Sequence, residues 1–162
     1  MAIIKGDLLV KIGIIVHSHT GNTLSVAQRL KEALAASGHS VALERVTAVN
    51  ENPNAAMHAK LKIIPDTSSY DMLIFGAPVR GFSLSPVMKL YLAQLPALNG
   101  KKVGCFLTQS FPHPAMGGNQ AMVQFRKACV TKGASIFETC IVNWSMGRER
   151  RIANLIEKMG KI

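Results

Sequence analysis

The sequence predicts an α/β fold in which a parallel β-sheet carries helices on both faces. Short β-rich runs alternate along the chain with segments whose apolar residues recur at helical spacing. Several runs, such as residues 72–76 and 103–108, are apolar at nearly every position, as central strands covered on both sides are. The 162 residues, 48% of them hydrophobic, are enough for one such core, so a single domain over residues 1–162 is expected.

The expected elements follow one another with clear boundaries over most of the chain. Strands are expected at residues 10–16, 41–46, 72–76, 103–108 and 135–142, and helices at residues 22–37, 86–94, 119–132 and 146–158. Gly38 and Gly133 are stop signals after two helices, and Pro86 suits the first position of another. Segment 50–69 leaves room only for a short helix around residues 55–62. Residues 1–9 are either an extension or a lengthening of the first strand.

The loop between the first strand and the first helix is rich in hydroxyl groups. It consists of Ser18, His19, Thr20, Gly21, Asn22 and Thr23. Hydroxyls and exposed backbone N–H groups at a helix start bind phosphate, and a glycine lets the backbone approach closely. The motifs of dinucleotide and nucleoside triphosphate loops are both absent, which argues against a triphosphate. The alternative is an ordinary capped turn between strand and helix.

This loop resembles the FMN phosphate loop of the flavodoxin family, Thr/Ser-x-Thr-Gly-x-Thr, at Ser18, Thr20, Gly21 and Thr23. The stretch from Tyr70-Asp71 to Gly76-Ala77-Pro78 resembles the Tyr-Asp…Gly-x-Pro region of the same family, which also includes NAD(P)H-dependent FMN reductase-like proteins. The resemblance spans nearly the whole chain. It implies a doubly wound five-stranded sheet in the order 2-1-3-4-5, with FMN bound beyond the carboxyl ends of strands 1 and 3.

The resemblance also implies which residues hold the cofactor. The first loop, 18–23, would bind the FMN phosphate. The loops after the third and fourth strands would flank the ring and bind its polar edge; their expected cofactor-binding residues are Pro78, Val79, Arg80, Gly81 and Phe82, and Thr108, Gln109, Ser110 and Phe111. No protein nucleophile is expected.

The aromatic residues depart from the pattern of typical electron-carrier flavodoxins, which often place the ring between Trp and Tyr. Here Phe82 and Phe111 are the candidates for ring contact, and the alternative for each is a core anchor. Arg80 near the flavin would favour the reduced, anionic ring and make the flavin less strongly reducing; alternatively it extends into water.

The histidines and cysteines carry weaker predictions. His19 and His113 lie in the first and third loops, where each either contacts an anion or donates a proton, or is an ordinary surface residue. His17, at the end of the first strand, receives less weight. Cys105, Cys129 and Cys140 are expected to be reduced core thiols rather than a disulfide or metal site.

The charge of the chain is its unusual bulk property. The chain contains 19 Lys and Arg and nine Asp and Glu, which give a net charge of +10. Residues 101–162 alone carry ten basic and three acidic side chains. Such a surface attracts an acidic redox partner, an anionic membrane or nucleic acid, or only keeps the protein solvated. Few aromatic residues lie among the basic ones, which disfavours nucleic acid. Arg148, Arg150 and Arg151 either form an anion-binding or partner-docking patch or pair with Glu149, Glu157 and solvent at little net cost.

The function expected from the sequence is electron transfer by an FMN-binding protein, either a small carrier or a minimal flavin-dependent reductase, with a redox partner protein that the charge suggests is acidic. No apolar run approaches the roughly 20 residues of a membrane span, and no secretory signal is evident, so a cytoplasmic location is expected. The alternative function is a non-redox binding module of the same fold that uses its basic C-terminal face to engage an acidic protein or nucleic acid.

Overall fold

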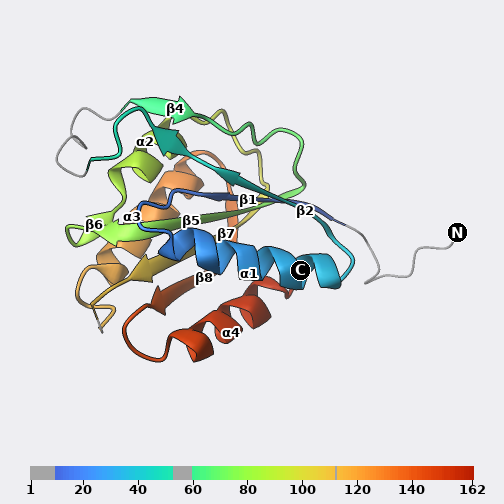
Figure 1. The fold of residues 1–162 in the computed structure, drawn as a ribbon. Helices are drawn as coiled ribbons and strands as arrows, with labels where there is room; N and C mark the ends of the chain where they lie inside the picture. Colours follow the sequence, from blue (N-terminus) through green and yellow to red (C-terminus); the bar gives the residue numbers. More distant parts are fainter. Residues whose placement is uncertain (1–9, 53–59, 112) are drawn as a thin grey trace, which may run out of the picture.

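The computed structural model describes residues 10–52, 60–111 and 113–162, and its centre is a parallel sheet (Figure 1). The sheet has the strand order β2-β1-β5-β7-β8, which confirms the order 2-1-3-4-5. Its strands are β1 (Lys11–Val16), β2 (Ser40–Arg45), β5 (Met72–Arg80), β7 (Lys102–Gln109) and β8 (Ser135–Asn143). The helices between and after them are α1 (Asn22–Ala36), α2 (Pro86–Gln94), α3 (Gly118–Thr131) and α4 (Arg148–Met159).

The helices form two layers, one on each face of the sheet (Figure 1). Because side chains alternate along a strand, Ile12 and Ile14 pack under α1 and α4, whereas Ile15 packs under α2 and α3. Both apolar clusters are closed to solvent. This burial on two faces explains why the central strands are apolar at consecutive positions.

The expected helix boundaries are close to the observed ones, and the predicted end signals act as expected. Ser85 caps α2 by accepting from Met88 N–H, and Pro86 is the first helical residue. Gly38 and Gly133 have φ angles of 95° and 87°, the left-handed conformation that ends a helix. The sequence therefore specifies these helices locally.

Three short strands were not expected. β3 (Thr47–Ala48) pairs antiparallel with β4 (Leu61–Ile63), and β6 (Ser83–Leu84) pairs antiparallel with the end of β5. The short helix expected around residues 55–62 is wrong at residues 61 and 62, which are in β4; residues 55–59, like the N-terminal residues 1–9, lie outside the described residues. The expected strand 72–76 continues to Arg80, because β7 pairs with it through Pro78 and β6 pairs with Val79 and Arg80.

Candidate cofactor-binding site

Three loops that are far apart in the sequence meet at the carboxyl edge of the sheet. The parallel register places Val16 of β1 beside Gly76 of β5, and Pro78 of β5 beside Thr108 of β7. A buried hydrogen bond of 2.7 Å joins the hydroxyl groups of Thr23 and Thr108, so the start of α1 is tied to the end of β7. The structure thus brings the predicted phosphate loop and both predicted ring loops together.

The loop before α1 leaves the helix start open to an anion. Gly21 precedes the helix with φ 96°, and as a glycine it has no side chain that could cap the helix. The first turn of the helix contains no acidic residue. Ser18 Oγ accepts from Leu24 N–H at 3.2 Å, which folds the loop back over the first turn. A Cβ on Gly21 would meet no atom within 4 Å, so the space beside it is free. This donor-rich loop fits a phosphate group.

The loop after β5 is a hairpin whose two turn residues have unusual backbone angles. Gly81 and Phe82 have φ angles of 55° and 61°, as the two central residues of a type I′ turn do. The left-handed conformation is costly for a bulky residue such as Phe. The strained turn presents the Phe82 side chain outwards, 54% exposed.

Phe82 and Phe111 lie face to face at the mouth of the site. Their rings are stacked with an interplanar angle of 1° and a centroid distance of 5.6 Å, and Phe111 is 49% exposed. The interpretation of either residue as a core anchor is therefore wrong. Two half-exposed aromatic rings paired across two loops are suited to contact a planar ligand.

The loop after β7 is held by the end of β8. The Asn143 side-chain amide donates to the carbonyl oxygen of Phe111, and Ser145 Oγ donates to the carbonyl oxygen of Ser110 at 2.7 Å. Gln109, which is buried, donates through Nε2 to the carbonyl oxygen of His113 at 2.6 Å. Gln109 therefore shapes the loop from within. Asn143 is a site residue that the sequence did not reveal.

Gly117 connects the two ring loops. It precedes α3 with φ 108°, and a Cβ on it would lie 2.6 Å from Phe82 Cα and 3.1 Å from Val79 Cγ1. Only a glycine permits this approach of α3 to the hairpin. Val79 therefore faces α3, and Arg80, the next residue of the strand, lies on the other side of the hairpin.

The comparisons with known proteins agree with this architecture. The family model described as Flavodoxin domain matches residues 13–132, which is more than half of the chain. The chain belongs to the flavodoxin family. It is 27% identical over 135 residues to the flavodoxin of Megasphaera elsdenii, covering 82% of this chain and 85% of that protein.

Two solved structures have the same fold as this flavodoxin-family protein. The solution structure of two-electron reduced Megasphaera elsdenii flavodoxin has a TM-score of 0.69 at 25% identity, covering 93% of this chain and 99% of that one. A flavoprotein in complex with FMN from Lactobacillus acidophilus NCFM has a TM-score of 0.61 at 16% identity, covering 82% of this chain and 93% of that one. The second likeness concerns the fold alone.

Arg80 and Gly81 of the hairpin and His19 of the first loop line a pocket of about 390 Å³. His17 and Glu51 also line it, together with Ser85 at the start of α2. In the part of the chain that the structure describes, Arg80 forms no ion pair with a carboxylate. Two residues predicted for the site, Arg80 and His19, therefore meet at this pocket.

His17 directly follows β1, as expected, and is the centre of a buried hydrogen-bond network in this pocket that the sequence did not reveal. Its Nδ1 lies 2.6 Å from Ser85 Oγ and its Nε2 lies 2.9 Å from Glu51 Oε2, and Glu51 also accepts from Ala48 N–H. Burial lowers the pKa of His17 more than the hydrogen bond and charge of Glu51 raise it. A neutral ring accepting from Ser85 and donating to Glu51 satisfies all three groups.

Burial favours the neutral form of the Glu51 carboxyl group, just as it favours the neutral form of His17. Two hydrogen-bond donors instead favour the ionised carboxylate. Hydrogen bonds from Ala48 N–H and His17 outweigh the effect of burial, so the pKa of Glu51 lies below its ordinary value. Glu51 is therefore ionised beside a neutral His17. The network fixes the end of β1 to the start of α2 and so supports the hairpin from behind.

Proposed function

We propose that this protein is an FMN-dependent electron carrier whose cofactor lies across the three loops at the carboxyl edge of the sheet. FMN binding and electron transfer follow from its membership of the flavodoxin family. The observation that carries the assignment to these loops is the meeting of the open α1 start with the paired, half-exposed Phe82 and Phe111. The bound flavin supplies the redox chemistry by accepting and releasing electrons.

The residues 18–23 hold the phosphate in this proposal. The buried Ser18 and Thr23 fix the loop through hydrogen bonds to Leu24 N–H and to Thr108, which leaves the exposed Thr20 and the backbone N–H groups at the helix start to bind the anion. Backbone N–H donors and the positive end of the α1 dipole stabilise a phosphate without a cation. The positive charge of Arg80 in the neighbouring pocket adds to the favourable potential.

Phe82 and Phe111 cover the ring in this proposal. A flavin ring between them needs about 3.5 Å of clearance on each side, so a pair at a centroid distance of 5.6 Å has to separate for the ring to fit between the two faces. Both side chains are about half exposed, so separating them does not disturb the core. The hairpin and the loop after β7 carry this adjustment.

The loop after β7 presents its donors to the polar edge of the ring. The carbonyl oxygens of Gln109, Ser110 and Phe111 accept from Trp144 N–H, Ser145 Oγ and the Asn143 amide respectively. With these carbonyls turned toward β8, the peptide N–H groups of Ser110 and Phe111 are the groups left to bind the carbonyl oxygens of a flavin. Thr108 lies behind them and links this loop to the phosphate loop.

Electrons pass between this flavin and partner proteins, as they do in the flavodoxin family. The net charge of +10 supports an acidic partner. Within the described residues no helix combines the length and apolar character that crossing a bilayer needs. The proposal includes one domain over residues 1–162 and a cytoplasmic location, which the three free, buried cysteines support. The alternative of a non-redox binding module is not favoured, because the family is one of FMN-binding electron carriers.

The test is a titration of the purified protein with FMN, followed by flavin absorbance and fluorescence. Thr20→Ala removes an exposed hydroxyl from the phosphate loop, and Gly21→Asp places a negative charge there; both are expected to weaken FMN binding by tenfold or more. Ser40→Ala removes an exposed hydroxyl at the opposite edge of the sheet and is expected to change nothing. Failure of the folded, unmodified protein to bind FMN would overturn the proposed function, and equal affinities of all variants would overturn the assignment of the loop.

A further inference from the structure

Arginines gather at the cofactor edge of the molecule. Arg45 ends β2, Arg80 ends β5, and Arg148 and Arg150 lie in the first turn of α4, directly after β8. Because the strands are parallel, the ends of β2 and β5 and the start of α4 lie at the carboxyl edge of the sheet (Figure 1), and the four arginines lie there with them. Lys11 and Lys102, which begin β1 and β7, lie at the opposite edge. We call the first four residues the arginine rim.

The carboxylates that accompany the arginine rim are already engaged. Glu44 accepts from Tyr70 Oη at 2.5 Å, Glu51 binds His17, and Glu149 accepts from Arg29 at 2.7 Å. Glu149 also lies 4.0 Å from Arg148 Nε, which is a weak contact for an ion pair. The alternative of pairing with Glu149, Glu157 and solvent is therefore borne out in part: Arg148 pairs with Glu149, which Arg29 binds more closely, and within the described residues no α4 arginine pairs with Glu157. The four rim arginines face three carboxylates, Glu44, Glu51 and Glu149, and Arg29 adds a further positive charge beside Glu149, so a small formal excess of positive charge remains at this edge.

The position of two of these arginines opposes the stability of the helix that carries them. Arg148 and Arg150 lie at the N-terminus of α4, where the helix dipole disfavours cations. Arg148 is held over the ring of Trp144 at 4.5 Å, so its guanidinium has a fixed place beside the loop after β7. Both residues are exposed. The contact with Trp144 and the acidic Glu149 in the same turn offset part of this cost for Arg148, whereas Arg150 has no ion pair within the described residues.

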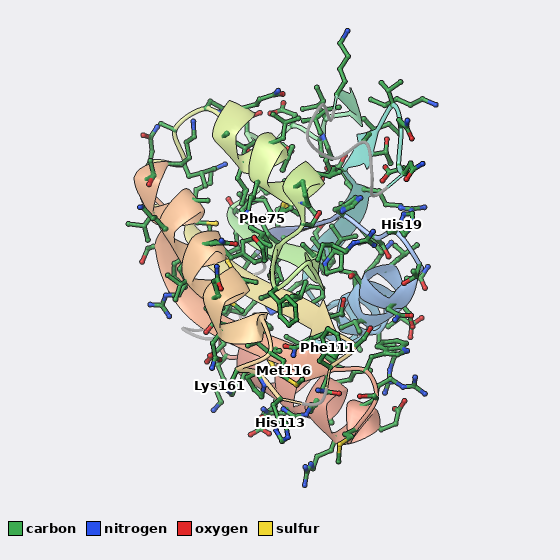
Figure 2. The ribbon with its side chains drawn as sticks, turned by 90° about the vertical axis from the view of Figure 1, so that its left-hand side faces the viewer. His19, Phe75, Phe111, His113, Met116 and Lys161 are labelled. Atoms are coloured by element: carbon green, nitrogen blue, oxygen red, sulfur yellow. The ribbon has the colours of Figure 1, made fainter. Side chains whose placement is uncertain are left out.

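Four exposed apolar side chains, called the apolar centre, lie at the same edge of the sheet as the arginine rim. Phe82, Phe111 and Met146 are 54%, 49% and 61% exposed, and Met116 adds to them from the loop after β7. Figure 2 shows Phe111, Met116 and His113 together at this end of the molecule. An apolar centre inside a charged border is the usual anatomy of a protein docking site. It coincides with the place at which the proposed flavin is approached.

We propose that the arginine rim, with the apolar centre at the same edge, is the docking surface for an acidic redox protein that exchanges electrons with the flavin. This inference rests on the proposed function and adds the partner's chemistry and the place where it binds. The rim steers a negatively charged partner to the cofactor edge, and the apolar centre then provides close contact.

The experiment uses two small haem proteins of opposite charge, the acidic cytochrome b5 and the basic cytochrome c. The FMN-loaded protein is reduced and mixed with the ferric haem protein in a stopped-flow instrument. Each haem takes one electron, so one two-electron-reduced flavin reduces two haems and returns to its oxidised form, releasing protons to water. At low salt the second-order rate constant with cytochrome b5 is expected to be high and to fall as salt is added, whereas the rate constant with cytochrome c is expected to rise.

Two double variants distinguish an effect of the rim's position from an effect of the net charge on the reaction rate. Arg148→Glu with Arg150→Glu reverses two rim charges, and the helix dipole favours the new side chains, so α4 is expected to remain folded. Lys102→Glu with Lys127→Glu makes the same change in net charge at exposed positions away from the rim. The rim variant is expected to slow the reaction with cytochrome b5 at least tenfold, and the control less than threefold. An equal effect of both variants, or none, would overturn the proposal.

Further measurements keep this proposal distinct from the proposed function. Calorimetric titration of the FMN-free protein with cytochrome b5 measures docking even if FMN fails to bind, and binding that the rim variant weakens would support the surface by itself. Anionic lipid vesicles and duplex DNA are tested with the same variants. Rim-dependent binding to vesicles or DNA, without any rim dependence for cytochrome b5, would overturn the assignment to a protein partner.

Discussion

Phe82 combines a strained backbone with an exposed ring, and that combination points to function. At φ 61° a phenylalanine costs about 1–2 kcal/mol relative to a glycine. The stacked contact with Phe111 is worth about 0.5–1.5 kcal/mol, which roughly offsets this cost. The turn therefore gains little stability from its aromatic residue.

Phe82→Gly is accordingly expected to leave the unfolding free energy of the FMN-free protein within about 1 kcal/mol of the original, because relief of strain offsets the lost contact. FMN binding is expected to weaken by about tenfold, the equivalent of ~1.4 kcal/mol. Urea unfolding and FMN fluorescence titration measure the two effects. Phe111→Ala, which loses the same contact without any relief of a positive φ, serves as the control and is expected to be less stable than Phe82→Gly.

Arg80 is expected to tune the flavin through its charge. It forms no ion pair within the described residues, and it lies with His17 and His19 in the pocket beside the hairpin. Arg80→Gln removes a cation that favours the reduced flavin, so the potential is expected to fall by tens of millivolts, given that ~1.4 kcal/mol corresponds to about 59 mV for one electron. Spectroelectrochemical titration measures it, with Lys102→Gln as the control. An unchanged potential would mean that Arg80 only extends into water.

At the level of elements, the hairpin and α3 depend on each other at Gly117. Gly117→Ala adds a methyl group 2.6 Å from the backbone of Phe82 and does so at φ 108°. We expect a loss of about 2 kcal/mol of unfolding free energy, from backbone strain and the displaced hairpin together, and weaker FMN binding. Chemical unfolding and FMN titration measure both.

Gly100→Ala is the matched control for this substitution. Gly100 also has a positive φ, 77°, but a Cβ there meets no atom within 4 Å. It therefore reports the backbone strain alone. Equal losses of stability for the two variants would show that the contact between Gly117 and the hairpin contributes nothing, and FMN binding should remain intact in the Gly100→Ala protein.

The long elements could be predicted from the sequence, whereas the short ones could not. A buried parallel strand or an amphipathic helix repeats its pattern over several residues, and stop signals such as Gly38 mark where it ends. β3, β4 and β6 have two or three residues each, too few to show any period. Pro78, which the sequence analysis assigned to the loop after the third strand, stands inside β5.

The same distinction applies to the site. The loop 18–23 carries its pattern in consecutive residues, so its position could be found. The contacts of Asn143 with Phe111 and of His17 with Ser85 join residues 32 and 68 positions apart, and only the fold brings them together. Gly117 is likewise one of 13 glycines, and nothing local distinguishes it.

In the molecule as a whole, the parallel strands place the charged arginines and the proposed cofactor site at the same edge of the sheet, the carboxyl edge. The cofactor loops and the arginine rim lie there because all five main strands end there. The buried His17 network lies at the same edge and connects β1, the segment after β3 and α2. Protonation of this one group therefore affects contacts between distant segments, and its effect should be visible in the stability of the entire chain.

The pH dependence of folding provides the test. The pKa of His17 is lowered in the folded protein, chiefly by burial. Below about pH 6.5 the His17 side chain therefore binds a proton in the unfolded chain but remains neutral in the folded protein. The unfolding free energy is therefore expected to fall as the pH drops from 7.5 to 5.5, by at most about 1.4 kcal/mol per pH unit for one proton. The contribution of Glu51, whose pKa is also lowered, is present above its unfolded pKa and is lost only at more acidic pH.

Urea unfolding of the FMN-free protein between pH 7.5 and 5.5 measures the slope of the unfolding free energy against pH. His17→Gln is expected to flatten it and His113→Gln to preserve it; an unchanged slope in His17→Gln would assign the proton to another group.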